Sequence, residues 1–313
     1  MFESFFVALR VVAPMALLMG LGVLIRKAKI TDRPTMRAMD KVCFRVFMPA
    51  LLFRNIYDSD LANSLGWKEP VFIIGCLLLL FALSLLIIPR LLPDRRQAAS
   101  VSQAIFRCNY ILFGIAVAES IYGDGNAGMV AVLGVVVVPA LNALSVVVLE
   151  VCRAGKIHPG KLLLSVLKNP LIIASILALL AKAIPQPLPE TVYSVVKDVG
   201  SLATTISFLS LGVSLDLGEL RRNRSPLLLG IVTRLVVIPL IFLPLAVLCG
   251  FRGQSMCAML VFFAAPAAVS SFPMAASMGA DGPLAGQLVC CTTLLSVITI
   301  FCYTFLLNSF GFL

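Results

Sequence analysis

The chain has 313 residues, of which 60% are hydrophobic and only 13% are charged. Soluble domains hold about 45–50% apolar and about 25% charged residues, so this composition excludes a disordered chain, a fibrous protein and an ordinary cytosolic enzyme. Together with the mean hydropathy of +1.04, it indicates a polytopic membrane protein. The net charge of +10 does not indicate nucleic-acid binding, because the basic residues form short clusters between apolar runs, where membrane topology places them.

Apolar stretches without Asp, Glu, Lys or Arg predict ten membrane-spanning helices. The clearest stretches cover residues 71–89, 125–149, 253–280 and 282–313. The first apolar run, 11–25, has no A-x-A-like site after it, which indicates a retained helix rather than a signal peptide. The predicted helices cover residues 4–25, 36–56, 70–90, 98–121, 126–150, 161–183, 191–214, 225–248, 254–277 and 283–308. Only short connections remain, so no soluble domain is expected.

The charges of these connections predict how the helices are oriented. Basic residues cluster in alternate connections, at 26–33, 90–96, 153–161 and 221–224, whereas the connections between them are poor in Lys and Arg. Since basic loops stay in the cytoplasm, both termini of this cell-membrane protein are predicted to be extracytoplasmic. The ninth connection, with Asp281 and no basic residue, gives this orientation no support.

No residue pattern indicates a metal site or a catalytic group. None of the nine cysteines stands in a CxxC pair, and most lie in apolar runs, which is typical of buried small side chains. His158, the single histidine, lies in a predicted loop. We therefore expect no bound cofactor, and coupling of a transport reaction to H⁺ or Na⁺ stays open.

A shift of 156 residues, close to half of the chain, aligns the two halves. Pro14 then falls on Pro170, and Asn109 falls on Ala265. Each half holds five predicted helices, and an odd number turns the second half upside down relative to the first. The sequence therefore predicts two inverted-topology repeats, residues 1–156 and 157–313, as in many secondary transporters. A chance match between apolar sequences is the alternative.

The helix predicted at 36–56 carries Pro49, a candidate for a helix break. The helix predicted at 98–121 carries Arg107 and Asn109 in apolar surroundings. Arg107 lies ~14 Å along this helix at 1.5 Å per residue, where a charge costs about 2.5–3.5 kcal/mol and a functional partner is the usual reason for it. The alternative is that the side chain snorkels to the headgroups.

Snorkelling is also the main expectation for two arginines at similar depth, Arg45 and Arg234. The helix predicted at 191–214 carries the hydroxyls of Thr204 and Thr205, which could bind a ligand or simply bond to their own helix.

The helix predicted at 254–277 carries Pro266 at its centre and Pro273 behind it. Each proline removes a helical hydrogen bond and clashes with the preceding turn, and a break within lipid occurs where a cavity can satisfy the freed backbone groups. We therefore predict a functional break at Pro266, with Ser270 and Ser271 as candidate ligand groups. A simple proline kink is the alternative.

Several segments of the chain resemble the auxin efflux carrier family of bacteria and plants. In chain order they are MGLGVLIRKAKI, VFMPALLFRNI, NYILFGIAVAESIYGDG, KNPLII, LGVSLDL and FFAAPAAVSSFPMAASMGADGPLA, and they extend over essentially the full length. The family pattern in the fourth helix resembles N-x-G-F-x-G-x-P. Asn109 and Gly114 match it, whereas Ile111, Leu112 and Ala116 replace its glycine, phenylalanine and proline.

The resemblance implies an all-α membrane protein of ten helices in two inverted repeats, with broken helices four and nine crossing as in bile-acid symporters. It further implies a scaffold of helices one, two, six and seven that forms a homodimer, and a transport domain of the other six. Family substrates are small organic anions such as auxin in plants and malonate in bacteria, and the missing long hydrophilic loop favours a bacterial-type member.

We therefore predict a secondary transporter that moves a small carboxylate by alternating access. Arg107 attracts the anion, Asn109 and Tyr110 contact it, and Pro266 and Gly114 keep the broken helices open. A sodium-coupled bile-acid-like symporter is the alternative, and the sodium dependence of uptake separates the two. An intramembrane enzyme would need paired carboxylates, a histidine cluster or an activated nucleophile, and a membrane sensor would need a larger output surface.

Overall fold

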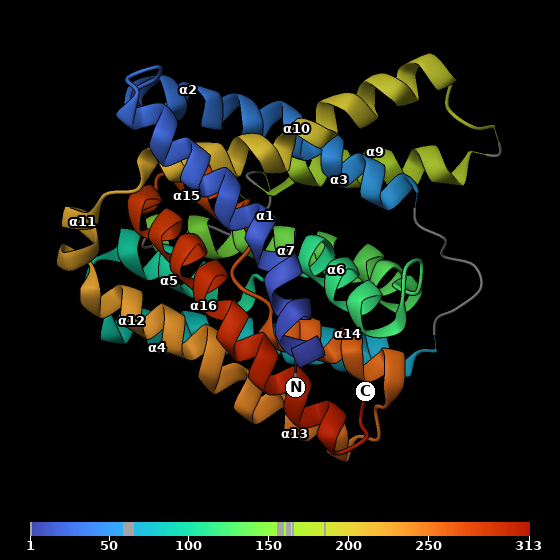
Figure 1. The fold of residues 1–313 in the computed structure, drawn as a ribbon. Coiled ribbons are helices and arrows are strands. Elements are labelled where there is room, and N and C mark those ends of the chain that lie inside the picture. Colours follow the sequence, from blue (N-terminus) through green and yellow to red (C-terminus); the bar gives the residue numbers. More distant parts are fainter. Residues whose placement is uncertain (1, 59–65, 155–159, 161–163, 165, 185) are drawn as a thin grey trace.

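The computed structural model describes residues 2–58, 66–154, 160, 164, 166–184 and 186–313. In this part of the chain every regular element is a helix (Figure 1), which confirms the all-helical prediction. One isolated antiparallel bridge, between Cys108 and Ala267, is the single β-type pairing found there. His158 and the predicted boundary between 1–156 and 157–313 lie outside the described residues.

Two helices of the first half begin at aspartates that cap them. The Asp32 carboxylate accepts the Thr35 N–H at 2.9 Å, and the Asp94 carboxylate accepts the Arg96 N–H at 2.8 Å. The helices are α1 (Phe2–Lys27), α2 (Arg33–Val42), the π-helical turn η1 (Cys43–Phe47), α3 (Met48–Tyr57), α4 (Lys68–Leu91), α5 (Arg95–Phe106), α6 (Tyr110–Tyr122) and α7 (Gly128–Ala154).

Three helices of the second half are capped by Asn169, Asp216 and Asp281. Asn169 accepts the Leu171 N–H at 3.0 Å and Pro170 stands in the first turn, so α9 begins there rather than at 161. Asp216 caps a short helix that the sequence analysis missed, α11. The helices are α9 (Pro170–Ala183), α10 (Glu190–Ser214), α11 (Leu217–Arg222), α12 (Arg224–Val232), the π-helical turn η2 (Thr233–Val237), α13 (Ile238–Leu248), α14 (Gly253–Ala264), α15 (Ser271–Ser277) and α16 (Gly282–Ser309).

Four described helices are long and apolar enough to cross a membrane by length and composition: Lys68–Leu91, Gly128–Cys152, Arg224–Leu248 and Gly282–Ser309. Tyr110–Tyr122, Pro170–Ala183 and Gly253–Ala264 are shorter apolar helices. The predicted break at Pro49 is not found, because the chain stays helical from α2 through η1 into α3. The local distortion there is the π-helical turn Cys43–Phe47, directly before the proline.

The helices form two groups that lie against each other. In the upper part of Figure 1, α1 packs on α10, and α3 packs on both α9 and α10. The contact of α1 with α10 is backbone to backbone, because a Cβ at Gly22 would collide with the Leu209 carbonyl and one at Gly212 with the Met19 carbonyl. The remaining long helices, α4 to α7, α12 to α14 and α16, lie mostly below, and α1 extends down to pack on α16 as well (Figure 1).

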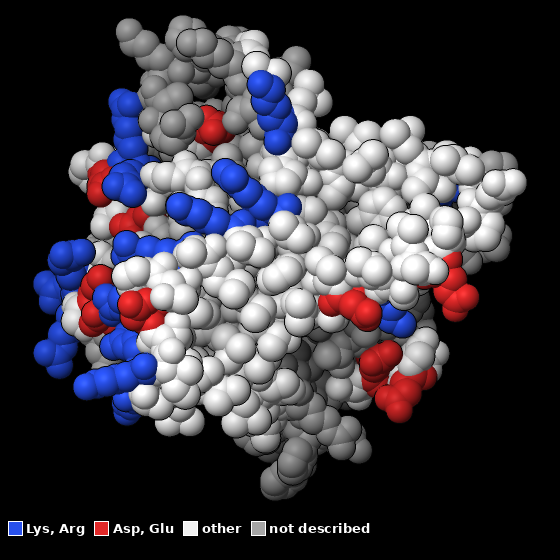
Figure 2. All heavy atoms as spheres, turned by 90° about the horizontal axis from the view of Figure 1, so that it is seen from above, with Lys and Arg blue, Asp and Glu red and all other residues white. Residues whose placement is uncertain are grey.

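Charged side chains are distributed unevenly over the surface. In Figure 2 most of the visible Lys and Arg side chains lie toward the end where α11 and the start of α2 are found, and mainly Asp and Glu lie at the opposite end. At the basic end the Arg33 guanidinium donates to the Asp216 carboxylate at 2.6 Å. This hydrogen bond, with one from the Gly218 N–H, lowers the pKa of Asp216 from its ordinary value of 3.8.

Candidate functional site

Two helices are interrupted near the centre of the molecule, and the two interruptions pair with each other. The chain leaves helical geometry at Arg107, between α5 and α6, and at Ala265, between α14 and α15. The Asn109 N–H donates to the Pro266 carbonyl at 2.9 Å, and the Ala268 N–H donates to the Arg107 carbonyl at 3.1 Å. Each break therefore satisfies backbone groups that the other has freed, as a membrane interior requires.

The second break is also tied to a neighbouring helix. Pro266 lies within it, at the place where the sequence analysis expected the helix to open. The Ala267 N–H donates to Thr292 Oγ1 of α16 at 3.1 Å. The first break contains neither glycine nor proline, so pairing with the second break, rather than local backbone preference, keeps it open.

Arg234, in η2, lies behind the crossing point. Its side chain is fully buried, at 0% exposure, and it uses all three guanidinium nitrogens. Nε donates to the Ala265 carbonyl at 2.8 Å, Nη2 to the Phe262 carbonyl at 2.7 Å and Nη1 to the Ile105 carbonyl at 3.1 Å. The prediction that Arg234 snorkels is wrong, because its partners are the carbonyl ends of α5 and α14. Arg45, by contrast, is exposed.

Arg107 lies on the other face of the crossing point and contacts side chains instead. Its Nη2 donates to Asn142 Oδ1 at 2.5 Å and to Ser270 Oγ at 2.8 Å, and its Nη1 lies against the Met274 sulfur. It is 3% exposed. Within the described chain, no carboxylate lies within ion-pair distance of it. Its guanidinium is therefore held at the crossing rather than extended to a headgroup.

A cavity of about 100 Å³ opens beside Arg107. It lies between α3, α9 and α10 on one side and the two breaks and α7 on the other. Its polar lining consists of Asn55, Arg107, Asn109, Asn142, Thr204 and Ser270, and the other lining residues are mainly apolar. No acidic residue is among the described residues that line it.

One amide donor at this cavity has no partner. The Nδ2 of Asn109 is buried and makes no hydrogen bond within the described residues. Buried amide donors are rarely left unpaired, and each costs about 1–3 kcal/mol if it stays so. The cavity thus combines one positive charge without a counterion and one unused donor, which together suit a negatively charged oxygen.

A match to a family model shows which protein family the chain belongs to. A family model described as "Membrane transport protein" matches residues 7–161 and 156–304, almost the whole length. The chain belongs to the auxin efflux carrier family. A comparison with curated proteins gave no match. Family membership and the apolar helices make this a multi-pass membrane transporter, which fits a protein that is not an enzyme.

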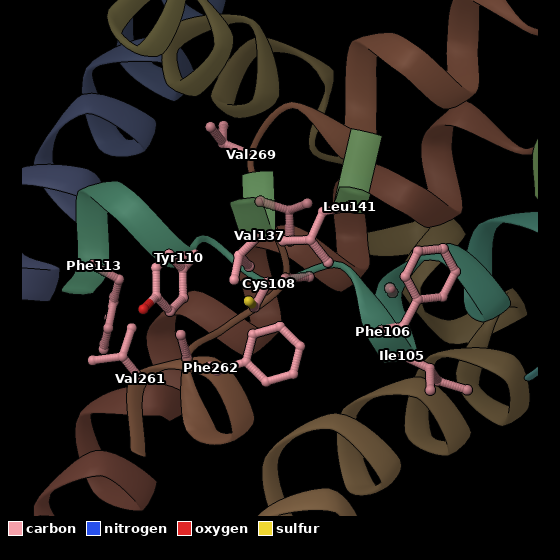
Figure 3. Packing of buried hydrophobic residues seen from close by; sticks show 14 of the residues in the cluster. Ile105, Phe106, Cys108, Tyr110, Phe113, Val137, Leu141, Val261, Phe262 and Val269 are labelled. Atoms are coloured by element: carbon pink, nitrogen blue, oxygen red, sulfur yellow. The ribbon is translucent and has the colours of Figure 1, made fainter. Parts of the chain in front are cut away.

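The structure brings several of the predicted site residues of this transporter together and separates others from them. Arg107, Asn109, Tyr110, Thr204 and Ser270 all line the cavity. The Tyr110 ring, however, packs with its centroid 6.2 Å from that of Phe262, and its hydroxyl is buried without a partner in the described chain. Figure 3 shows this ring among apolar side chains, with its hydroxyl pointing toward Phe113 and Val261.

Three of the predicted residues do not contribute as expected. Thr205 is exposed, because successive helical residues point about 100° apart and Thr204 takes the cavity side. Ser271 is buried in the first turn of α15 and does not line the cavity. Gly114 lies inside the continuous helix α6 and is not a break. A Cβ there would meet Val130 and Val261 at 2.6 and 2.8 Å, so the glycine allows close packing instead.

Sequence reasoning missed two amides of the cavity, Asn55 and Asn142. Asn142 lies in the middle of an apolar span, and a polar residue in that position is itself a signal of function. Asn55 stands near the end of α3, where a polar residue is ordinary, so the sequence holds no comparable signal for it.

Proposed function

We propose that this auxin efflux carrier family member transports a small organic carboxylate, which binds in the cavity beside the crossing of the two breaks. The observation that carries the proposal is the charge of the lining: one arginine, an unpaired amide donor and no acidic side chain. A carboxylate accepts hydrogen bonds from both donors, and charge-assisted bonds of this kind are about twice as strong as neutral ones. The apolar walls contact the hydrocarbon part of the substrate.

The present hydrogen-bond partners of Arg107 are groups that a bound carboxylate can replace. Asn142 Oδ1 and Ser270 Oγ are neutral acceptors on rotatable side chains. A carboxylate oxygen is a better acceptor for the guanidinium fork, so the substrate replaces one or both of them. Asn142 and Ser270 then remain beside the bound anion as hydrogen-bonding groups.

We further propose alternating access between two groups of helices. The scaffold consists of α1, α2 with α3, α9 and α10, and the transport domain of α4 to α7 and α12 to α16. A second cavity of about 400 Å³ supports this division, since α2 and α10 line it on one side and α5, α15 and α16 on the other. Both cavities lie against the continuous helix formed by α2, η1 and α3. The first cavity contacts α3, ~10 Å further along the helix axis than the part of α2 that lines the second cavity.

The ten-helix, inverted-repeat architecture belongs to the same proposal. The 156-residue shift carries Asn109 in one break onto Ala265 in the other, and the two family matches divide at residues 156–161. The basic end of the surface then faces the cytoplasm and both termini lie outside. Labelling of a cysteine introduced at Gly311 tests the orientation, and reaction only from the cytoplasmic side contradicts it. The scaffold helices form the interface of a homodimer.

Ligand-induced stabilisation and uptake test the substrate class. Small mono- and dicarboxylates, with malonate first, should raise the apparent Tm of the purified protein, because a ligand stabilises the state that binds it. Amines of matched size should not. Labelled malonate should accumulate in proteoliposomes, and replacement of Na⁺ by choline shows whether sodium drives it. Ser270→Ala should weaken binding, whereas Ser271→Ala, a buried neighbour outside the cavity, is the matched control. Stabilisation by amines alone would contradict the proposal.

A further inference from the structure

Two of the three carbonyl oxygens around Arg234 lose their helical partners because of the two breaks, and the third, that of Ala265, stands at the C-cap of α14. In a continuous helix the Phe262 carbonyl would accept the N–H of residue 266, but that residue is Pro266 and has none. The Ile105 carbonyl would accept the N–H of Asn109, which donates to the second break instead. These oxygens converge on one buried point, and each is 2.7–3.1 Å from a guanidinium nitrogen.

The charge at this point is balanced. A helix C-terminus carries roughly half a negative elementary charge, and the C-terminal ends of α5 and α14 both lie at the Arg234 side chain. Two such ends amount to about one negative charge, which one guanidinium neutralises. Arg234 therefore leaves little field to attract a substrate, and the anion attraction falls to Arg107 on the opposite face.

Converging carbonyl oxygens are also the ligands that small cations use in membrane carriers. In broken-helix transporters, unwound carbonyls and half-helix C-terminal ends coordinate the coupling ion, and rings of carbonyls replace the hydration shell of ions in channels. In this chain the same kind of oxygen cluster holds a cation that is covalently attached to η2. The π-helical turn itself is a local distortion that often marks functional positions.

We propose that Arg234 is a built-in cation, which occupies the place of a coupling ion at the crossing point and makes carboxylate transport independent of Na⁺. This inference rests on the proposed function for the substrate, but the cation site itself does not depend on which substrate is carried. Arg234 acts as a positioning residue, since it holds the ends of α5 and α14 together without touching the cavity.

Cation rescue tests the proposal. The wild-type Tm should be the same in NaCl and in choline chloride. Arg234→Ala should lower the Tm by roughly 5 °C or more, and free guanidinium or Na⁺, but not choline, should restore part of this loss. Arg45→Ala, which removes an exposed arginine, should show neither the loss nor the rescue. Arg234→Lys keeps a tethered cation and should stay insensitive to Na⁺.

Uptake of labelled malonate gives the functional readout. Wild-type uptake should be equal in Na⁺ and choline, whereas any uptake by Arg234→Ala should rise with guanidinium or Na⁺. Sodium-dependent stability or uptake of the wild type would overturn the proposal, even if the alanine variant does not fold. So would an alanine variant that ignores every cation. If malonate and the other carboxylates fail while the Tm rescue holds, the substrate assignment is wrong and the cation site stands.

Discussion

The crossing point of the two broken helices has two faces, and each face holds one buried arginine. Arg234 donates to three backbone carbonyls, whereas Arg107 contacts two side-chain oxygens and a thioether. Backbone acceptors are fixed by the fold and carry the negative ends of the helices. Side-chain acceptors are neutral and can rotate away. The same residue type therefore binds backbone on one face and lines the cavity with exchangeable side-chain partners on the other.

The largest effect is expected on the Arg234 face. Arg234→Gln should lower the free energy of unfolding by about 3–5 kcal/mol, because buried carbonyl oxygens lose a charged donor. Arg107→Gln should lower it by less than about 2 kcal/mol, since its partners can hydrogen-bond to each other or to water. Unfolding of both purified variants in parallel measures the difference. Equal losses would mean that the two faces are not distinct.

Binding should show the reverse order. Arg107→Gln should weaken carboxylate binding by about 2–5 kcal/mol if the charge pair is desolvated. Arg107→Lys keeps the charge but loses the planar fork, so it should bind more weakly than wild type while still preferring anions. Calorimetry on folded protein measures both affinities. If Arg107→Gln binds the anion as tightly as wild type, the cavity face does not depend on this charge.

Pro266 connects the two faces, because it frees the Phe262 carbonyl for Arg234 and lies beside the Asn109 N–H. Pro266→Ala restores an N–H that competes for that carbonyl, a gain of about 0.5–1.5 kcal/mol for the closed helix. We expect normal expression and reduced uptake. Unchanged uptake would show that the proline is only a kink and that the pairing of the breaks suffices.

The surface ion pair of Arg33 and Asp216 should have the smallest effect on stability. The lowered pKa of Asp216 means that the pair stabilises the protein above the ordinary pKa of 3.8 and ceases to do so as the pH falls through the folded-state pKa. Asp216→Asn should remove this small pH dependence and leave neutral-pH stability nearly unchanged. A loss of unfolding free energy as large as that of Arg234→Gln would show that the difference in burial between Arg33 and Arg234 does not decide how much each contributes to stability.

The helices themselves were largely predictable, since apolar runs, proline positions and caps act locally. The break at Pro266 belongs to this class, because a missing N–H is a property of the residue itself. The break at Arg107 does not. It contains neither glycine nor proline, and its backbone groups pair with those of the second break. Placing the opening at Gly114 followed a family pattern, but this glycine serves packing between helices.

The roles of the arginines were decided in three dimensions. By itself the sequence determined that Arg107 and Arg234 lie within apolar spans, where a charge requires a partner. It did not determine the partners of Arg234, because backbone carbonyls exist at every residue and carry no sequence signal. Nor did it determine that Thr204 rather than Thr205 faces the cavity, which depends on how α10 is rotated against its neighbours. The sequence shows that a charge within an apolar span needs compensation, and only the packing of distant segments decides which groups compensate it.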